Sequence, residues 1–311
     1  MNQDTSHITP PHAPQGFRSG YVALIGRPNA GKSTLLNRLV GEKIAAVSNK
    51  PQTTRFAIQG IVTRPEGQIV LVDTPGVHKP GYLLNRRMMS AVHEALAGVN
   101  LVVLMRDASV STGNGDRFVF ELVRESQKPA ILALNKIDKI PDKAELLSLI
   151  EFYRDQHDWQ AIVPLSARKG KAVDALLGEV IKNLPEGEAI FGADELTDQP
   201  MRVLVAEIVR EKILETTGEE LPYVTAVVTE RYDESEPGLV RINCAILVER
   251  QSQKKIIVGR AGERIKDIGT RARQDILPLL DGQRVYLELF VKVEADWRNS
   301  HIALNDLGIR E

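Results

Sequence analysis

An apolar run at residues 21–25, which predicts a buried strand, leads into Gly26-Arg27-Pro28-Asn29-Ala30-Gly31-Lys32-Ser33 and then into a predicted helix. Glycine lets successive backbone N–H groups face a polyphosphate, and the helix start adds unpaired donors. Lys32 would bring positive charge to the outer phosphates, and the Ser33 hydroxyl would bind a magnesium ion. A plain glycine-rich turn would explain the glycines but not the Lys-Ser pair. The sequence therefore predicts a nucleotide-binding loop made of Gly26, Arg27, Pro28, Asn29, Ala30, Gly31, Lys32, Ser33 and Thr34.

Length and charge limit the classes of protein that this chain can belong to. A chain of 311 residues suggests two domains, each with its own core. The net charge of −1 shows no general affinity for nucleic acid, so such a site would need local segregation of charge. The single cysteine, Cys244, excludes an intrachain disulfide and a cysteine-rich metal site. Because residues 1–16 lack the apolar core of a signal peptide, we expect a disordered leader there and a cytoplasmic protein.

A second polar motif, Asp73-Thr74-Pro75-Gly76, ends a predicted antiparallel hairpin at residues 57–72. A carboxylate at the carboxyl end of a strand lies where an open α/β sheet binds its ligand. Asp73 would hold the magnesium through water, and the Gly76 N–H would face the terminal phosphate. Alone, these residues fit an ordinary turn. After a phosphate-binding loop, they predict further nucleotide contacts from Asp73, Thr74, Pro75 and Gly76.

The motif Asn135-Lys136-Ile137-Asp138 follows an all-apolar strand at residues 130–134 and predicts which base is bound. A carboxylate accepts from two donors at once, and guanine presents a ring N–H beside an exocyclic amine. Adenine would place a lone pair there, and an unpaired buried group costs about 1–3 kcal/mol. All-apolar strands alternating with helices also predict a doubly wound, mostly parallel α/β sheet. The base-binding candidates are Asn135, Lys136, Ile137 and Asp138, together with Ser166, Ala167 and Arg168 after the last strand.

The second half of the chain has a different pattern, which begins after an acidic linker at residues 185–198. Apolar residues at helical spacing predict an amphipathic helix over residues 200–217. A strand over residues 223–232 is expected next, with a polar loop to residue 238. Alternating apolar residues then predict a half-buried strand over residues 240–248 that turns Cys244 into the core as an inert thiol.

The later part of this half has a Gly-x-x-Gly motif, Gly259-Arg260-Ala261-Gly262, between two predicted helices. Glycines at such a turn let a nucleic-acid backbone approach closely. Residues 250–273 contain eight basic and two acidic residues, a local charge of +6. A solvated helix face would also carry this charge, but its place beside the Gly-x-x-Gly motif favours RNA. The candidate RNA contacts are Lys254, Lys255, Gly259, Arg260, Ala261, Gly262, Arg264 and Lys266.

The nucleotide motifs, in this order and spacing, resemble those of the translation-factor class of GTPases. Gln52-Thr53-Thr54-Arg55 together with Asp73-Thr74-Pro75-Gly76 resembles the Era family, and the later element order resembles a type II KH domain. The resemblance covers residues 17–308. It implies a GTPase domain at residues 17–184, a linker at 185–198 and a KH-type RNA-binding domain at 199–311. Hydrolysis of GTP to GDP and phosphate would use Lys32, Thr54 and Gly76, with Mg²⁺ held by Ser33, Thr54 and Asp73.

Membership of this family further implies binding to the 3′ end of small-subunit ribosomal RNA and work in small ribosomal subunit assembly. We expect a monomer, and the resemblance leaves open a peripheral fraction at the inner membrane. Val77 follows Gly76 where Ras-type GTPases carry a water-orienting Gln, so the group that positions the attacking water is not identified. Asn29 resembles the K⁺ ligand of potassium-stimulated relatives, and a role in the loop turn alone is equally compatible.

Three other functions would share some of these sequence features. A GTP-dependent tRNA-modifying protein would share the phosphate-binding loop but would need a catalytic cysteine near the C-terminus, whereas Cys244 is expected in the core. The tandem-GTPase ribosome factors need a second phosphate-binding loop, which the sequence lacks. A GTP-gated tether to RNA or membrane with negligible hydrolysis stays open, and single-turnover hydrolysis distinguishes it from an enzyme.

Overall fold

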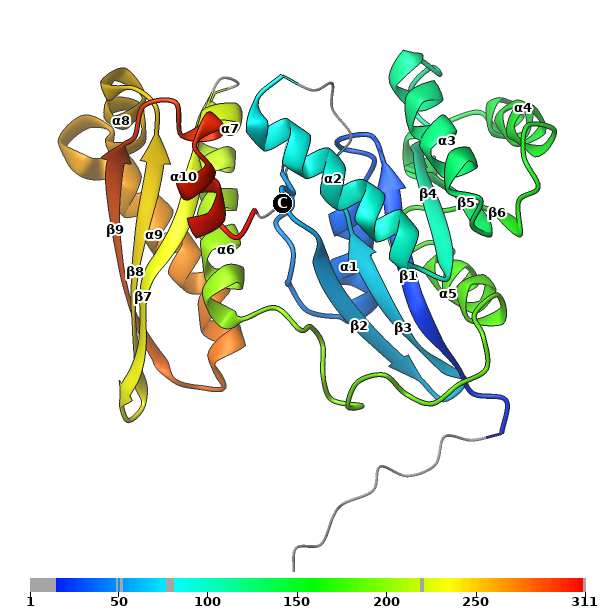
Figure 1. Cartoon of the computed structure of the whole chain (residues 1–311), viewed down its shortest axis with the longest axis horizontal. Helices are drawn as coiled ribbons and strands as arrows, with labels where there is room; N and C mark the ends of the chain where they lie inside the picture. Colours follow the sequence, from blue (N-terminus) through cyan, green and yellow to red (C-terminus); the bar gives the residue numbers. More distant parts are fainter. Residues whose placement is uncertain (1–14, 49, 51–52, 77–80, 219–220, 310–311) are drawn as a thin grey trace, which may run out of the picture.

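The computed structural model describes residues 15–48, 50, 53–76, 81–218 and 221–309. Gln52 and Val77, which enter the sequence predictions, lie outside the described residues. The described chain forms two sheets that lie side by side, each covered by its own helices, with α6 between them (Figure 1). No helix in these ranges is long and apolar enough to cross a membrane.

The first sheet has six strands in the order β2-β3-β1-β4-β5-β6, and only β2 runs antiparallel to its neighbour. The predicted doubly wound, mostly parallel α/β fold is therefore confirmed. Its strands are β1 (Arg18–Gly26), β2 (Ile58–Arg64), β3 (Gly67–Asp73), β4 (Leu101–Asp107), β5 (Ala130–Asn135) and β6 (Ala161–Pro164). Its helices are α1 (Lys32–Val40), α2 (Leu83–Gly98), α3 (Asn114–Ser126), the 3-10 helix η1 (Ile137–Lys139), α4 (Lys143–Arg154) and α5 (Val173–Lys182).

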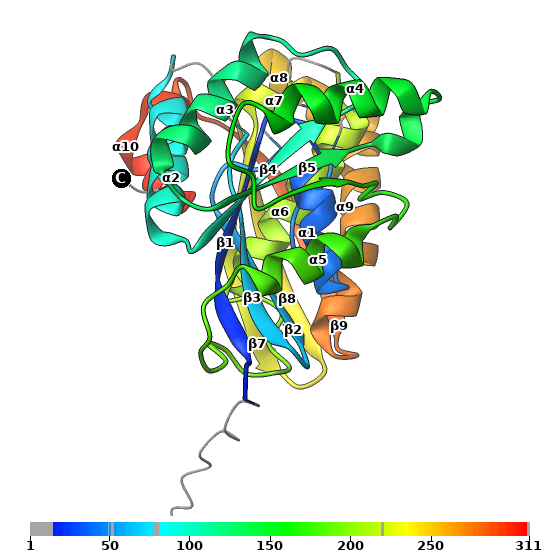
Figure 2. The same cartoon turned by 90° about the vertical axis from the view of Figure 1, so that its right-hand side faces the viewer.

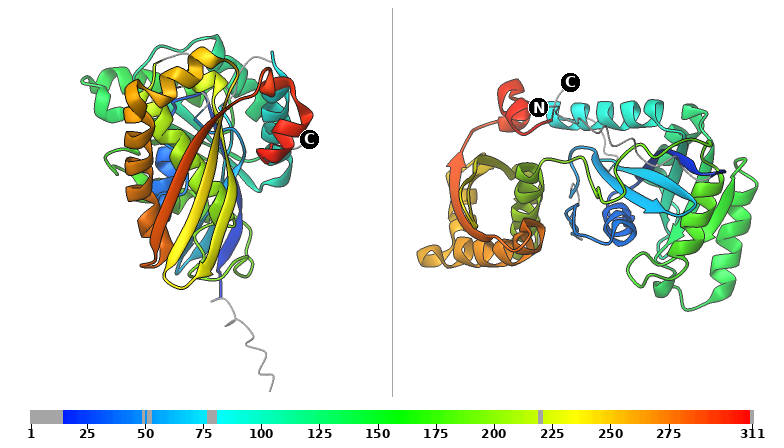
Figure 3. Two further views of the ribbon diagram at one scale, coloured as in Figure 1. Left: turned by 90° about the vertical axis from the view of Figure 1, so that its left-hand side faces the viewer. Right: turned by 90° about the horizontal axis from the view of Figure 1, so that it is seen from below.

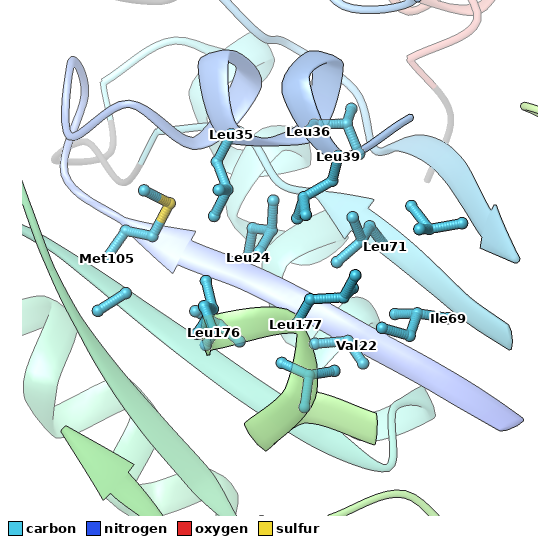
Figure 4. Close-up of a cluster of buried hydrophobic side chains, with 14 of the residues drawn as sticks. Val22, Leu24, Leu35, Leu36, Leu39, Ile69, Leu71, Met105, Leu176 and Leu177 are labelled. Atoms are coloured by element: carbon cyan, nitrogen blue, oxygen red, sulfur yellow. The ribbon is translucent and has the colours of Figure 1, made fainter. Parts of the chain in front are cut away.

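Alternate residues of β1 face two separate core layers. Val22 and Leu24 pack with Leu35 of α1 and with α5 (Figure 4). Ala23 and Ile25 face the other way, toward α2, α3 and α4. Figure 2 shows α2 and α3 on one side of these strands and α1 and α5 on the other. Because both faces of the sheet are covered, its central strands are continuous apolar runs, which places their polar residues at the carboxyl ends.

The second sheet has the order β7-β8-β9, with β7 antiparallel and β9 parallel to β8. Helices α6, α8 and α9 pack on one face, and the C-terminal helices cover part of the other (Figure 3). The elements are α6 (Met201–Thr216), α7 (Leu221–Val224), β7 (Ala226–Glu236), β8 (Leu239–Val248), α8 (Gln251–Val258), η2 (Arg260–Gly262), α9 (Glu263–Ile276), η3 (Leu277–Leu280), β9 (Arg284–Val293), η4 (Trp297–Asn299) and α10 (His301–Asp306).

Three predictions for this second half are wrong in detail. Residues 223–224 belong to α7, and β7 extends to Glu236 through the predicted polar loop. The helix α6 is not amphipathic in the expected sense, since every residue from 204 to 214 is buried. Its apolar side packs in the second core, while Glu211 on its polar side contacts the first domain. The strand β8 is buried on both faces from Cys244 onward, because Trp297 and α10 cover Ala245 and Leu247.

Residues 185–198 lie along the first sheet. The Ser19 hydroxyl donates to the Glu188 carbonyl at 2.6 Å, and the Gln68 side-chain carbonyl accepts from the backbone of Ile190 at 2.7 Å. Farther along, the Ile61 N–H donates to the Leu196 carbonyl at 2.8 Å. These bonds hold the acidic segment against the first domain, on the way to α6.

Candidate functional site

The segment between β1 and α1 turns through two left-handed residues, Asn29 with φ 64° and Gly31 with φ 101°. A Cβ on Gly31 would lie 2.2 Å from the side-chain nitrogen of Asn135, so only glycine fits there. Lys32 begins α1, is 6% exposed and donates from Nζ to the Gly26 carbonyl at 3.2 Å. Burial lowers the pKa of Lys32, and the carboxylate of Asp73 opposes that shift. A helix start and a buried ammonium group thus meet at one anion-binding loop.

Three oxygen-bearing side chains converge beside this loop. The Ser33 hydroxyl donates to Asp73 Oδ2 at 2.6 Å and lies 3.0 Å from Thr54 Oγ1, which itself donates to Asp73 Oδ2 at 3.2 Å. Asp73 is fully buried, and its Oδ1 has no hydrogen-bond partner among the described residues. Burial raises the pKa of Asp73, whereas Lys32 and the two hydroxyl groups lower it. Hydroxyl and carboxylate oxygens, one of them unpaired, fit a magnesium ion.

Asn135, at the end of β5, holds two other segments in place through its side chain. Its Nδ2 donates to the Ala30 carbonyl in the phosphate-binding loop at 2.8 Å, and its Oδ1 accepts from the Ala167 N–H at 2.9 Å. The side chain is 2% exposed. Because both ends of the amide are occupied, Asn135 orders the loops that line the cavity. The N–H of Ala167, one of the base-binding candidates, is therefore engaged by Asn135.

The base end of the site is built around Asp138, which is exposed. The Ser166 hydroxyl donates to Asp138 Oδ1 at 2.5 Å, and this bond lowers the pKa of Asp138. A carboxylate oriented by one hydroxyl group and ionised at neutral pH suits a ligand with two adjacent donors. Nearby, Lys136 has φ 67° and its Nζ lies 2.6 Å from Asp107 Oδ2. The sequence analysis did not select Asp107. Its place at the end of β4, at the carboxyl edge of the sheet, could have identified it.

These parts surround one cavity of about 340 Å³. Its lining includes the predicted residues Pro28, Asn29, Gly31, Lys32, Ser33, Thr34, Thr54, Gly76, Asn135, Lys136, Asp138, Ala167 and Arg168. It also includes residues that motif reasoning did not select, namely Ala46, Val47, Ser48, Thr53 and Lys139. Most of these additions come from residues 43–56, a polar loop whose fold depends on distant contacts, so spacing in the sequence could not place them.

Other predicted residues lie behind the cavity and support it. The Thr74 hydroxyl donates to the Leu24 carbonyl at 2.8 Å, which ties the segment after β3 to β1. Arg27 turns away and donates from Nη1 to Asp116 Oδ2 at 2.9 Å. The remaining predicted residues outside the lining are Gly26, Ala30, Asp73, Pro75, Ile137 and Ser166. The structure therefore separates residues that face the cavity from residues that shape it.

The Gly-x-x-Gly loop joins α8 to α9 and is strongly bent. Gly259, Ala261 and Gly262 have φ of 75°, 50° and 80°. A Cβ on Gly259 would lie 2.7 Å from Arg264 Cβ, so this position needs glycine for space as well as for conformation. A Cβ on Gly262 would meet no atom within 4 Å, which means that the surface there is open to a ligand.

The predicted basic residues around this loop are not equivalent. Lys255, Arg260 and Lys266 are exposed, whereas Lys254 and Arg264 are partly buried. The Arg264 guanidinium donates to the Ile256 carbonyl and so closes the end of α8. A backbone bend open to solvent, with exposed cationic side chains beside it, is an arrangement suited to phosphodiester groups.

Comparisons with known proteins support the predicted assignments of both halves of the chain. The family described as 50S ribosome-binding GTPase matches residues 21–136, and the KH domain family matches residues 220–298. The GTPase Era of Trichlorobacter lovleyi is 47% identical over 292 residues, which are 94% of this chain and 98% of that protein. The chain belongs to the Era family of GTPases. The predicted family is thus confirmed, and with it the activity of a GTPase.

Further relatives in this family support the same assignment. The GTPase Era of Leuconostoc citreum is 46% identical over 95% of this chain and 97% of its own. A crystal structure of an Aquifex aeolicus Era variant bound to GDP·AlF₄⁻ matches with a TM-score of 0.91 at 39% identity, covering 95% of this chain and 100% of that one. A structure of Era with MgGDPNP and nucleotides 1506-1542 of 16S ribosomal RNA matches with the same TM-score, identity and coverage.

Proposed function

We propose that this chain is a GTP-driven switch that binds the 3′ end of small-subunit ribosomal RNA and acts in small ribosomal subunit assembly. One observation carries the proposal: a nucleotide cavity and an open, basic Gly-x-x-Gly loop occur in a chain with a TM-score of 0.91 to an Era structure containing MgGDPNP and 16S ribosomal RNA. The proposed bounds are residues 17–184 for the GTPase domain, 185–198 for the linker and 199–311 for the KH-type domain.

In this proposal the cavity binds GTP with its phosphates on the loop at residues 26–33. Lys32 neutralises the outer phosphates, and the Gly76 N–H faces the terminal one. Ser33, Thr54 and Asp73 hold Mg²⁺, which when bound supplies charge that offsets the charge developing on the phosphates. Asp138, ionised and oriented by Ser166, accepts the two N–H donors of guanine.

Several finer assignments complete the proposal. Asn29 holds a K⁺ ion at the phosphates, supported by its place in the cavity lining and its left-handed backbone. The protein acts as a monomer in the cytoplasm, and the family resemblance leaves open a peripheral fraction at the inner membrane. Cys244 offers no nucleophile for a tRNA-modifying reaction, because it is fully buried and burial raises the pKa of its thiol to about 11.

The test combines RNA binding with GTP turnover. With a non-hydrolysable GTP analogue present, an oligonucleotide with the 3′-end sequence of small-subunit RNA is expected to bind more tightly than a scrambled one of equal length. A double variant, Arg260→Asp with Ala261→Asp, places two carboxylates where phosphates would lie, so RNA binding is expected to be lost while GTP turnover without RNA stays. Equal binding of both oligonucleotides, or RNA binding unchanged in the double variant, would overturn the RNA assignment. Absent single-turnover hydrolysis would favour the tether instead.

A further inference from the structure

Arg55 lies inside the contact between the two domains. Arg55 directly follows Thr54, which is one of the three residues whose side-chain oxygens would bind the metal. Only 2% of the surface of Arg55 is exposed. Its guanidinium donates to the backbone carbonyls of Thr225 at 2.8 Å and of Pro222 at 2.6 Å. The group also lies over the ring of Trp297, 5.3 Å from its centroid. All three partners belong to the second half of the chain.

This burial places the positive charge in an unfavourable setting. Arg55 is almost fully buried, and the cations Arg210 and Arg298 lie near its guanidinium, as does the carboxylate of Glu207. The Glu207 carboxylate is itself bonded to Arg210, and Arg55 Nε has no hydrogen-bond partner among the described residues. A buried cation that is held mainly by carbonyl groups and a ring has an unfavourable desolvation free energy. Apolar residues could hold two domains together without that free-energy cost.

The start of the same loop is held by the second domain as well. Glu211 of α6 accepts from the backbone N–H of Val47 at 2.7 Å and from the Lys43 ammonium group. Val47 lines the nucleotide cavity. Lys43 and Val47 before Thr54, and Arg55 directly after it, are therefore all bonded to the second domain.

We infer that Arg55 is a positioning residue for GTP hydrolysis. By docking in the second domain, Arg55 holds Thr54 against Ser33 and Asp73. Consecutive Cα atoms are about 3.8 Å apart, so an immobilised Arg55 leaves Thr54 little freedom. The second domain in this way completes the catalytic site of the first. The inference rests on the proposed role of Thr54 in the nucleotide site.

The experiment compares Arg55→Ala with the matched variant Arg87→Ala in the full chain. Arg87 is also a buried arginine between the domains, and it donates to Asn305 Oδ1 at 2.9 Å and to the Ile309 carbonyl at 2.7 Å, but it is not adjacent to Thr54. Residues that orient metal ligands are typically worth about 10- to 100-fold in metal affinity or activity. We expect Arg55→Ala to lose that factor in single-turnover rate, with Arg87→Ala close to wild type.

A second readout does not depend on turnover. Binding of a non-hydrolysable GTP analogue by Arg55→Ala is expected to need a higher Mg²⁺ concentration, while GDP affinity stays unchanged, because the proposed contact of Thr54 is with the metal ion beside the γ-phosphate, which GDP lacks. Arg55→Lys is expected to recover part of both losses and serves as the test variant if Arg55→Ala does not fold. Wild-type turnover and Mg²⁺ dependence in the folded variant, or equal losses in Arg87→Ala, would overturn the inference.

Thr54→Ala separates this inference from the proposed function. If Thr54→Ala keeps normal turnover and Mg²⁺ dependence, the assignment of the metal-binding oxygens fails, and the role of Arg55 fails with it. If Thr54→Ala loses both while Arg55→Ala keeps both, the proposed function stands and only the positioning role is wrong.

Discussion

Lys43 and Asp275, which are 232 positions apart in the sequence, form an ion pair with 2.6 Å between Nζ and Oδ2. Lys43 begins the loop that carries Thr54, and Asp275 lies in the last turn of α9, the helix that begins at the Gly-x-x-Gly loop. Asp275 also pairs with Lys212 of α6 at 2.7 Å. The loop that lines the nucleotide cavity and the helix that begins at the Gly-x-x-Gly loop therefore share one carboxylate.

Asp275→Asn is expected to weaken the contact between the domains. Burial raises the pKa of Asp275, but hydrogen bonds from Lys212 and Lys43 lower it by more than burial raises it, so the net shift is downward. A carboxylate whose folded pKa is depressed stabilises the protein above its unfolded pKa of about 3.9, and this contribution disappears as pH falls through the folded value. Because Asp275 is partly exposed, we expect a loss of no more than about 1 kcal/mol at pH 7.

Urea unfolding at several pH values checks this expectation. The stability difference between wild type and Asp275→Asn should be present at pH 7 and should shrink below pH of about 4, where the wild-type carboxylate becomes protonated. Asp267→Asn, an exposed position on the same helix, is the matched control and should change little. A difference that persists unchanged to low pH would contradict the ionic origin of the effect.

Asp138→Asn is expected to change the base that the site prefers. The amide presents one acceptor oxygen and one NH₂ donor in place of two acceptor oxygens, so affinity for GTP should fall by about 10- to 100-fold, and xanthosine triphosphate should be favoured. Nucleotide competition measures the ratio directly. Asp142→Asn is the matched control, because Asp142 accepts from the Ala144 N–H at 2.8 Å as a helix cap and does not line the cavity. A GTP preference retained in Asp138→Asn would refute the assigned role of this carboxylate.

Lys32→Ala and Ser33→Ala are expected to reduce turnover by about 100-fold or more. The first removes the positive charge that faces the phosphates, and the second removes a metal-binding hydroxyl. Thr74→Val is the matched control for these two variants. The motif pattern predicts a nucleotide contact for Thr74, but the structure uses its hydroxyl to bond the Leu24 carbonyl. We expect this variant to lose about 1 kcal/mol of stability while keeping GTP affinity. Normal magnesium-dependent turnover in Lys32→Ala would exclude the phosphate-binding assignment.

The sequence predicts best where one local pattern determines the structure. The strands of the first sheet are covered on both faces, so their apolar runs identify them, and the motifs at their carboxyl ends follow. The helix α4 escaped prediction because Leu147 and Phe152 are 60% and 51% exposed, which blurs its periodicity. The all-round burial of α6 depends on the first domain, which packs against its polar side. The bracing by Asn135 likewise depends on segments far apart in the sequence.

Cys244 is expected to resist thiol reagents in the folded protein. Its side chain is fully buried, and burial raises the pKa of the thiol to about 11, while a hydrogen bond with Thr229 acts in the opposite direction. At pH 8 only about one thiol in a thousand would be ionised, and the thiolate is the reactive form. Labelling should be negligible in native protein and should reach one thiol per chain in denaturant. Rapid labelling of native protein would contradict the buried position.

Nucleotide and RNA are expected to change each other's affinity. The loop at residues 43–56 contacts the second domain through Glu211, Asp275 and the partners of Arg55, so ordering of this loop by GTP must alter how that domain docks. The acidic segment at residues 185–198 is bonded along the first sheet, so it does not take part in these contacts.

RNA affinities measured with GDP and with a non-hydrolysable GTP analogue test this coupling. We expect a ratio of about 5 to 150, and RNA must shift the relative affinity for the two nucleotides by the same factor, because coupling free energies are reciprocal. Lys43→Ala removes the shared ion pair and should reduce both ratios together, while the exposed variant Asp267→Asn should leave them in place. Identical RNA affinities in the two nucleotide states would mean that the domains bind their ligands independently, and a change in only one ratio would violate the linkage.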